Sequence, residues 1–259
     1  MRIARYTLGE DPTYGAVEDE GGRLVLAELQ GDPLYQATVF TGERLQLADV
    51  RLLAPVIPRS KVVGVGRNYA AHAQELGNDV PEQPLIFLKP NTSVIGPRDG
   101  IVYPEQTSDL HFEGELAIVI GRICRDLPRE RANEVIFGYT VANDVTARDL
   151  QKTDGQWARA KGYDTFCPLG PWISTELDAS DLRVSTELNG EPKQDGRTSQ
   201  FIFDIPEMLA YITSFTTLLP GDVVLTGTPA GVGPMLPGDE VSVSVEGIGT
   251  LTNKVIVRD

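Results

Sequence analysis

Two glutamates, Glu113 and Glu115, stand at the start of one of the most apolar stretches of the chain, in the segment LHFEGEL that continues into AIVI. Because side chains at positions i and i+2 of a β-strand project from the same face, we expect the two carboxylates to lie side by side. Adjacent carboxylates that lose hydration repel each other, so a proton or a cation must neutralise them. A hard divalent ion with oxygen ligands meets this need. The alternative is an edge strand whose two acids face water.

A third carboxylate, Asp144, ends the β-like run 139–144 and is followed by Arg148 and Gln151. Asp144 offers one more oxygen ligand, and the planar guanidinium of Arg148 suits a carboxylate. Three carboxylates with water ligands can hold Mg²⁺ or Mn²⁺ and leave coordination positions for a substrate. The pattern therefore favours a divalent-metal site at Glu113, Glu115 and Asp144.

A possible general base lies near the end of the segment VGVGRNYAAHAQE (63–75). The dinucleotide fingerprint GxGxxG fails there, because Tyr69 stands where its third glycine should be. His72 and Glu75 are three residues apart, so on a helix they share a face, and a carboxylate-oriented imidazole can act as a base. The alternative is a surface contact. His111 shares the alternation of the two glutamates, and we favour a strand-end histidine packed near acids over a position beside the metal.

These residues need a β-rich scaffold. Apolar runs predict strands at 62–65, 85–88, 116–120, 222–226 and 240–245. Helices are expected from Tyr69 to Leu76, with Gly77 as a stop, and at 128–136 and 206–213, each of the last two opening with proline. Short strands fill the first fifty residues, and the proline-containing segment 54–58 reads as a linker. We expect a mainly β fold with peripheral helices (α+β), a mixed β-sandwich roll, with a small N-terminal β domain at 1–57 and a catalytic domain at 58–259.

Composition excludes some function classes. The chain of 259 residues has a net charge of −14 and no lysine- or arginine-rich run, which argues against nucleic acid as a partner. No stretch approaches about 18 uninterrupted apolar residues, and the N-terminus has no apolar signal-like core, so we expect no membrane partner and a cytoplasmic location. An anionic substrate must then be held by locally placed cations or a metal.

Several blocks of the sequence, in order, resemble the fumarylacetoacetate hydrolase family. They are GRNYAAHAQE (66–75), FLKP (87–90), FEGEL (112–116), NDVTARDLQ (143–151), WARAKGYDTFCPLGPW (157–172) and LTGTPAGVG (225–233). The resemblance covers roughly residues 60–257. Fumarylacetoacetases proper are much longer, and their catalytic histidine and glutamate are not neighbours in sequence. This chain instead resembles the small members of the family, so fumarylacetoacetate itself is disfavoured as substrate.

The resemblance implies a role for each matching residue. It implies that Glu113, Glu115 and Asp144 ligate Mg²⁺ (or Mn²⁺), that His72 and Glu75 form a dyad in a lid that activates water, and that Lys161 faces the reacting oxygen. Substrate contact is implied for Arg148, Gln151, Thr228 and Lys89, with a structural ion pair under the metal ligands as an equal alternative for Lys89. A homodimer is also implied, and specificity is expected to lie in the lid around residues 72–83.

The first functional hypothesis is a metal-dependent enzyme for a small 2-oxo or 2-hydroxydienoic (di)carboxylic acid, resembling 2-hydroxyhepta-2,4-diene-1,7-dioate isomerase or a C–C bond hydrolase. Oxaloacetate decarboxylation and acylpyruvate hydrolysis use the same enolate and remain alternatives. A non-catalytic dicarboxylate-binding module is an alternative of another class, but it should have lost the dyad or the lysine. A scaffold with solvated acids would not be stabilised by Mg²⁺.

Overall fold

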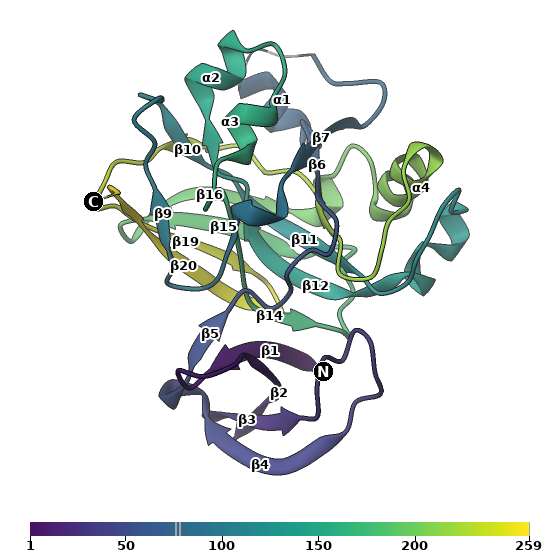
Figure 1. The fold of residues 1–259 in the computed structure, drawn as a ribbon. Coiled ribbons are helices and arrows are strands. Elements are labelled where there is room, and N and C mark those ends of the chain that lie inside the picture. Colours follow the sequence, from purple (N-terminus) through teal and green to yellow (C-terminus); the bar gives the residue numbers. More distant parts are fainter. Residues whose placement is uncertain (76, 78, 259) are drawn as a thin grey trace.

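A computed structural model describes residues 1–75, 77 and 79–258 of the chain. Its strands form one large sheet, a five-stranded sheet that packs against it, and a short three-stranded sheet, with the helices at the periphery (Figure 1). The expected mainly β fold with peripheral helices is thereby confirmed. No helix in the described part of the chain is long and apolar enough to cross a membrane.

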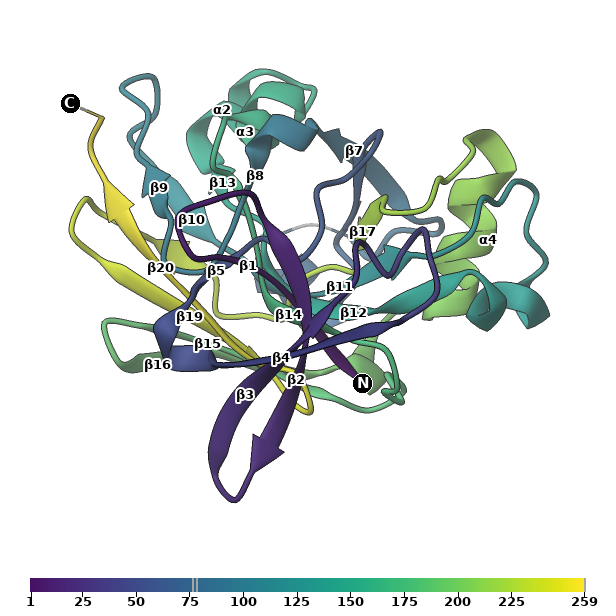
Figure 2. The ribbon, with the colours of Figure 1, turned by 60° about the horizontal axis from the view of Figure 1, so that its bottom comes forward.

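The N-terminal strands form one end of the large sheet, which contains β1 (Arg2–Thr7), β2 (Thr13–Glu20), β3 (Arg23–Leu29), β4 (Phe40–Gln46) and β5 (Arg51–Leu53), with the 3-10 helix η1 at Leu47–Asp49. Figure 2 shows β2 and β3 extending as a hairpin away from the other strands. β1 pairs with β14 of the following part of the chain, so the sheet continues across the expected boundary at residue 57. In the expected linker, Ala54 and Val56 are buried in the core rather than solvated.

The rest of the large sheet carries the most buried strands. They are β6 (Val62–Gly66), β7 (Leu85–Lys89), β8 (Val94–Ile95), β11 (Gly114–Ile120), β12 (Ile136–Asn143), β14 (Cys167–Ser174) and β17 (Val223–Leu225). Every residue of β11 is buried, because β12 and β17 flank it and the second sheet covers one of its faces. A continuous apolar run is the expected sequence of such a strand.

The second sheet contains β9 (Gly100–Val102), β15 (Arg183–Leu188), β16 (Glu191–Arg197), β19 (Glu240–Val245) and β20 (Gly249–Ile256). In β19, Val241, Val243 and Val245 are buried while the alternate residues are not, as a strand with one packed face requires. The three-stranded sheet consists of β10 (Leu110–Phe112), β13 (Thr146–Ala147) and β18 (Gly233–Pro234).

Short helices gather at one end of the molecule, where Figure 1 shows α1 (Ala70–Glu75), α2 (Arg148–Thr153) and α3 (Ala158–Gly162) close together. The longer α4 (Ile205–Phe215) matches the expected helix at 206–213, and Asp204 caps it by accepting a hydrogen bond from the Glu207 N–H at 2.8 Å. The 3-10 helix η2 (Asn91–Ser93) connects β7 to β8, and η4 (Thr198–Gln200) connects β16 to α4.

The helix predicted at 128–136 is instead a 3-10 helix, η3 (Arg129–Glu134). Only Ala132 is buried within it, so it has no apolar stripe that would hold a longer α-helix against the sheet. The expected end of the first helix at Leu76 lies outside the described residues, as does the last residue of the domain expected at 58–259.

Candidate functional site

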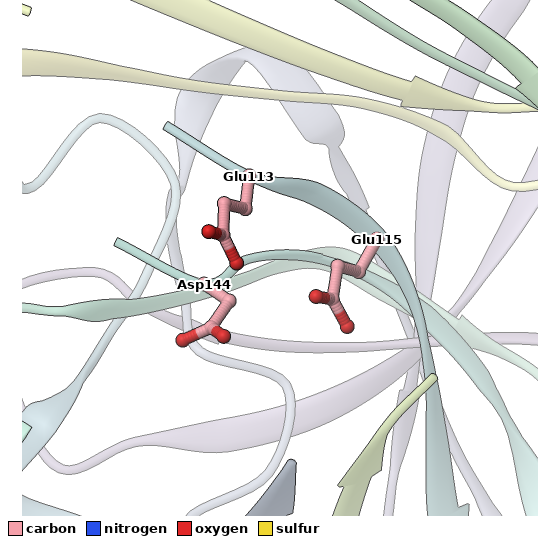
Figure 3. A group of neighbouring side chains, drawn as sticks. All are labelled: Glu113, Glu115 and Asp144. Atoms are coloured by element: carbon pink, nitrogen blue, oxygen red, sulfur yellow. The ribbon is translucent and has the colours of Figure 1, made fainter. Parts of the chain in front are cut away.

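The three predicted metal ligands converge at the ends of two neighbouring strands. Glu113 precedes β11, Glu115 lies within it, and Asp144 directly follows β12, whose Asn143 pairs with Gly114. Figure 3 shows the three carboxylates turned toward one another. An oxygen atom from each lies within 4.8 Å of those from the other two, and all three side chains are buried.

The route of the chain at Glu113 differs from the expected one. Glu113 is not part of a strand, because the chain passes there from β10 in the small sheet to β11 in the large one. Gly114 makes this passage possible, since a Cβ atom would lie 2.2 Å from Thr186 Oγ1. The alternative of an edge strand with solvated acids is wrong, because β11 has a neighbour on each side and both carboxylates are buried.

Two buried cations bind the same carboxylates directly. Lys161 Nζ donates to Glu113 Oε2 at 2.7 Å and to Asp144 Oδ2 at 2.5 Å. Arg148 Nη2 donates to Glu113 Oε1 at 2.5 Å, while its Nη1 donates to Gln151 Oε1 at 2.7 Å. The helices α2 and α3 thus place Arg148 and Lys161 against the candidate metal ligands.

Lys89 lies at the end of β7 and is almost completely buried, at 1% exposure. Its Nζ donates to Asp144 Oδ1 and, at 3.3 Å, to the backbone oxygen of Val145. This geometry favours the structural ion pair over a substrate contact for Lys89.

The two glutamates differ in their electrostatic surroundings. Burial acts to raise the pKa of Glu113, but Lys161 and Arg148 outweigh it and hold that pKa well below its usual range. Burial raises the pKa of Glu115 well above its usual range, and the neighbouring Asp144 and Glu113 raise it further. Among the described residues no cation pairs with Glu115, which accepts a hydrogen bond from the Gly227 N–H at 2.7 Å.

This donor set fits a divalent metal ion. A buried carboxylate without a paired cation, close to two others, is stabilised by added positive charge. Carboxylate oxygens are the ligands that Mg²⁺ and Mn²⁺ prefer. Glu113, Glu115 and Asp144 are therefore the residues that would hold the ion.

The dyad residues meet on α1. His72 is buried, and its Nδ1 lies 3.4 Å from Glu75 Oε2, while Glu75 also accepts hydrogen bonds from the Gly231 N–H at 3.0 and 3.1 Å. Burial lowers the pKa of His72, although Glu113 and Glu75 act in the opposite direction. The imidazole is therefore neutral near pH 7 and able to accept a proton. Its burial contradicts the alternative of a simple surface contact.

A cavity of about 40 Å³ lies between His72 and Glu113. Five of the ten predicted site residues line it: His72, Glu113, Arg148, Gln151 and Lys161. Neither Thr228 nor Lys89 belongs to the described residues that line it.

Thr228 instead supports the start of β11, at the glycine between the two glutamates. Its hydroxyl donates to the Gly114 carbonyl at 2.8 Å and accepts from Gln194 Nε2 at 2.7 Å, and Gln194 Oε1 accepts from the Gly114 N–H at 2.9 Å. Gln194 comes from β16 in the other sheet and was not predicted. Nothing in the local sequence indicates the role of Gln194, because its contact with Gly114 arises only from the packing of the two sheets.

Other residues around the site were either missed or placed as expected. Asn143, within a block that the sequence had singled out, accepts from the Glu113 N–H at 3.0 Å. Arg67 and Trp157 line the cavity, although no role was predicted for either. His111 Nε2 lies 2.8 Å from Asp109 Oδ1, which agrees with a histidine packed near an acid.

Comparison with family models agrees with this geometry. Residues 61–256 match the model described as fumarylacetoacetate (FAA) hydrolase C-terminal, and residues 1–55 match one described as Rv2993c-like, N-terminal. Together they cover almost the whole chain.

Two curated relatives show the range of similarity. Protein Rv2993c of Mycobacterium tuberculosis is 53% identical over 262 residues, covering 99% of this chain and 98% of that protein. The human protein named oxaloacetate tautomerase FAHD2A, mitochondrial, is 41% identical over 224 residues, covering 82% of this chain and 71% of its own.

Two solved structures are also similar. One, from Mycobacterium smegmatis, is described as 5-carboxymethyl-2-hydroxymuconate delta-isomerase; it is 52% identical, with a TM-score of 0.92 and 100% of both chains covered. The other is fumarylpyruvate hydrolase from Pseudomonas aeruginosa in complex with Mn²⁺ and pyruvate. It is 36% identical, with a TM-score of 0.74, and covers 78% of this chain and 91% of its own.

Proposed function

The chain belongs to the fumarylacetoacetate hydrolase family, and from this premise we propose that it is a divalent-metal-dependent enzyme acting on a small 2-oxo or 2-hydroxydienoic acid. The observation that carries the proposal is a cluster of three buried carboxylates, with Lys161, Arg148 and His72 lining a cavity beside one of them, Glu113. A neutral base, a buried cation and a cation-binding carboxylate cluster are the groups that enolate chemistry requires.

The charge balance of the site supports an anionic substrate. The carboxylates of Glu113, Glu115 and Asp144 are matched in number by the cations of Lys89, Lys161 and Arg148. A divalent ion would leave this group of residues with two excess positive charges. A 2-oxo acid supplies one negative charge as its carboxylate and a second when its enolate forms.

In the proposed mechanism, a bound Mg²⁺ or Mn²⁺ would supply Lewis acidity toward the oxo or enol oxygen of the substrate. Arg148, oriented by Gln151, binds and positions the substrate carboxylate. Lys161 holds positive charge beside the oxygen on which negative charge develops. His72 Nε2, with Nδ1 turned toward Glu75, accepts a proton from the substrate or from water.

We favour isomerisation or C–C hydrolysis of a 2-hydroxydienoic acid, as for 2-hydroxyhepta-2,4-diene-1,7-dioate. The similarity over the whole chain to the mycobacterial delta-isomerase supports this choice. A second candidate is turnover of oxaloacetate, by tautomerisation or decarboxylation, supported by the human relative's name. Acylpyruvate hydrolysis is a third, since fumarylpyruvate hydrolase has the same fold.

A non-catalytic dicarboxylate-binding module is a less favoured reading, because the histidine, its glutamate and the lysine are all in place. A homodimer, a cytoplasmic location, and separate domains at 1–57 and 58–259 remain proposals. The idea that specificity lies in residues 72–83 also remains one, and two of those residues, 76 and 78, lie outside the described part of the chain.

A substrate panel tests the proposal. Purified protein with Mg²⁺, with Mn²⁺ or with chelator is mixed with 2-hydroxyhepta-2,4-diene-1,7-dioate, oxaloacetate and acetylpyruvate. Loss of enol absorbance and release of pyruvate or CO₂ are followed. We expect metal-dependent turnover of at least one compound, and the product identifies the reaction. Equal rates with metal and with chelator would refute the metal-dependent function.

A further inference from the structure

The cavity beside Glu113 adjoins a larger groove, and two side chains line both. The cavity of about 40 Å³ and a groove of about 620 Å³ share Arg67 and Trp157 as lining residues. The Arg67 guanidinium lies 5.9 Å from the centre of the Trp157 ring. A ligand that reaches from the cavity into the groove along this shared wall therefore contacts the pair.

The backbone at Arg67 is arranged to hold the side chain in this position. Arg67 has a φ of 57°, in the left-handed region that non-glycine residues seldom adopt. The preceding Gly66 leaves room for Trp157, because a Cβ atom there would lie 2.8 Å from Trp157 Cζ3. An uncommon backbone conformation at a pocket is a reason to look for a function of that residue.

Arg67 also differs in its charge partners from the other cations of the site. Lys161, Arg148 and Lys89 are each bound to the metal-ligating acids. Arg67 lies at the cavity and is half-buried, but within the described residues it forms no ion pair. Its positive charge is therefore available to an anionic group of a ligand.

The groove itself is largely apolar where it meets this cation. Leu85, Ile86 and Phe87 of β7 line it together with Trp157. Phe87 packs edge-to-face on Trp157, with ring centres 5.6 Å apart, which gives the wall a defined shape. An apolar wall with one cation suits a short hydrocarbon chain that ends in a carboxylate.

We propose that Arg67, supported by Trp157, binds the distal carboxylate of the substrate and so makes the enzyme selective for dicarboxylic 2-oxo acids. This inference builds on the proposed function, because it assumes that the 2-oxo acid end lies at the metal ligands. Arg148 would hold the carboxylate next to the oxo group, and Arg67 the carboxylate at the other end.

Matched pairs of unreactive ligands test the inference. Calorimetry with the Mn²⁺-loaded protein compares 2-oxo acids of five, six and seven carbons, each with and without a terminal carboxylate, such as 2-oxoglutarate and 2-oxopentanoate. For at least one length we expect wild type to bind the dicarboxylate about tenfold or more tightly than its partner, since hydrogen bonds to charged groups are the stronger ones. In Arg67→Asn the difference should fall to about twofold, while Arg67→Lys should keep part of it.

Two controls test whether the effect is specific to Arg67. Asparagine tolerates the left-handed conformation, so Arg67→Asn should fold, which its melting temperature checks. Arg98 has a similar φ of 64° but is exposed and lines a different groove, so Arg98→Asn makes the same change away from the site. It should keep the wild-type preference.

The outcomes separate the two proposals. If the monocarboxylates and dicarboxylates bind equally well to wild type, or if Arg67→Asn keeps the preference, Arg67 does not select the distal carboxylate. If no 2-oxo acid binds with either Mn²⁺ or Mg²⁺, the proposed function itself is refuted, and the inference with it.

Discussion

Replacing Glu115 with glutamine should have opposite effects on the stability of the metal-free and the metal-bound protein. Glu115 is buried within 4.8 Å of Glu113 and Asp144 and, among the described residues, has no cationic partner. In the metal-free protein Glu115 therefore lowers the free energy of unfolding, either because its charge is repelled by the other carboxylates or because it must take up a proton. Glutamine has nearly the same shape, and it removes that cost.

The size of the expected stability change follows from the distance between the carboxylates. Two unit charges 4.8 Å apart repel by about 3 kcal/mol at an effective dielectric constant of about 20. Lys161 and the Gly227 N–H offset part of this repulsion, so we expect Glu115→Gln to raise the free energy of unfolding of the metal-free protein by about 1–2 kcal/mol. For a chain of this size that corresponds to about 2–4 °C in Tm.

With bound metal, wild type should be more stable than Glu115→Gln. A ligand that binds only the folded state at about 100 times its Kd adds about 2.7 kcal/mol of stability. Wild type should gain this much with saturating Mn²⁺, whereas Glu115→Gln, which lacks one charged ligand, should gain far less. Thermal melting followed by circular dichroism, with chelator and across a Mn²⁺ titration, measures both effects.

Glu113→Gln is the matched control. It leaves Lys161 and Arg148 without their shared carboxylate, so it should lower the stability of the metal-free protein by about 3 kcal/mol. If Glu115→Gln is no more stable than wild type without metal, or is stabilised by Mn²⁺ as strongly as wild type, the electrostatic reasoning about this site is wrong.

Three further predictions concern other residues. His72→Ala should keep the metal-dependent rise in Tm but reduce hydrolysis by about 100-fold or more in steady-state assays, and hydrolysis at the wild-type rate would contradict its role as base. Burial acts to raise the pKa of Asp222, but hydrogen bonds from Lys61 and from nearby groups outweigh burial and lower this pKa. The ionised Asp222 therefore stabilises the folded protein above the ordinary carboxyl pKa of about 4, and this stabilisation is lost as the pH falls below that value. Asp222→Asn should cost about 3 kcal/mol at pH 7 in urea unfolding and flatten the decline in stability on acidification, and an unchanged decline would contradict this. Gln194→Leu should lower stability by about 2 kcal/mol by leaving the Gly114 N–H without its acceptor, and should weaken Mn²⁺ binding about tenfold in calorimetry; unchanged affinity would show that Gln194 supports only the fold.

The convergence of the three acids could be predicted because each lies in or beside a strand that the local sequence marks clearly. The apolar run of β11 and the β-like run of β12 locate Glu115 and Asp144 at strand ends, and acids there need an explanation. His72 and Glu75 were likewise found from their spacing on a short helix. Such inferences succeed because backbone periodicity is a local property.

The roles of the cations around these ligands could not be predicted in the same way. Lys89 comes from β7, and it pairs with Asp144, 55 residues further along the chain. Gln194 lies 80 residues beyond Gly114, to which it is bonded. Gly66 leaves space for the Trp157 ring, which lies beside Arg67 although the two residues are far apart in the chain. No local pattern encodes such contacts, since they depend on which faces the sheets and helices bring together.

The sequence by itself determined that the fold is mainly β. It also identified the four-residue segment that contains the dyad and the three acids that a cation would join. These features follow from side-chain chemistry and from strand or helix spacing. Tertiary structure alone decided that Glu113 lies at a crossing between sheets, that Glu115 is the carboxylate without a cation among the described residues, and that Arg67 stands between cavity and groove. The physical reason is that charge pairing and burial depend on distances in space between residues far apart in the chain.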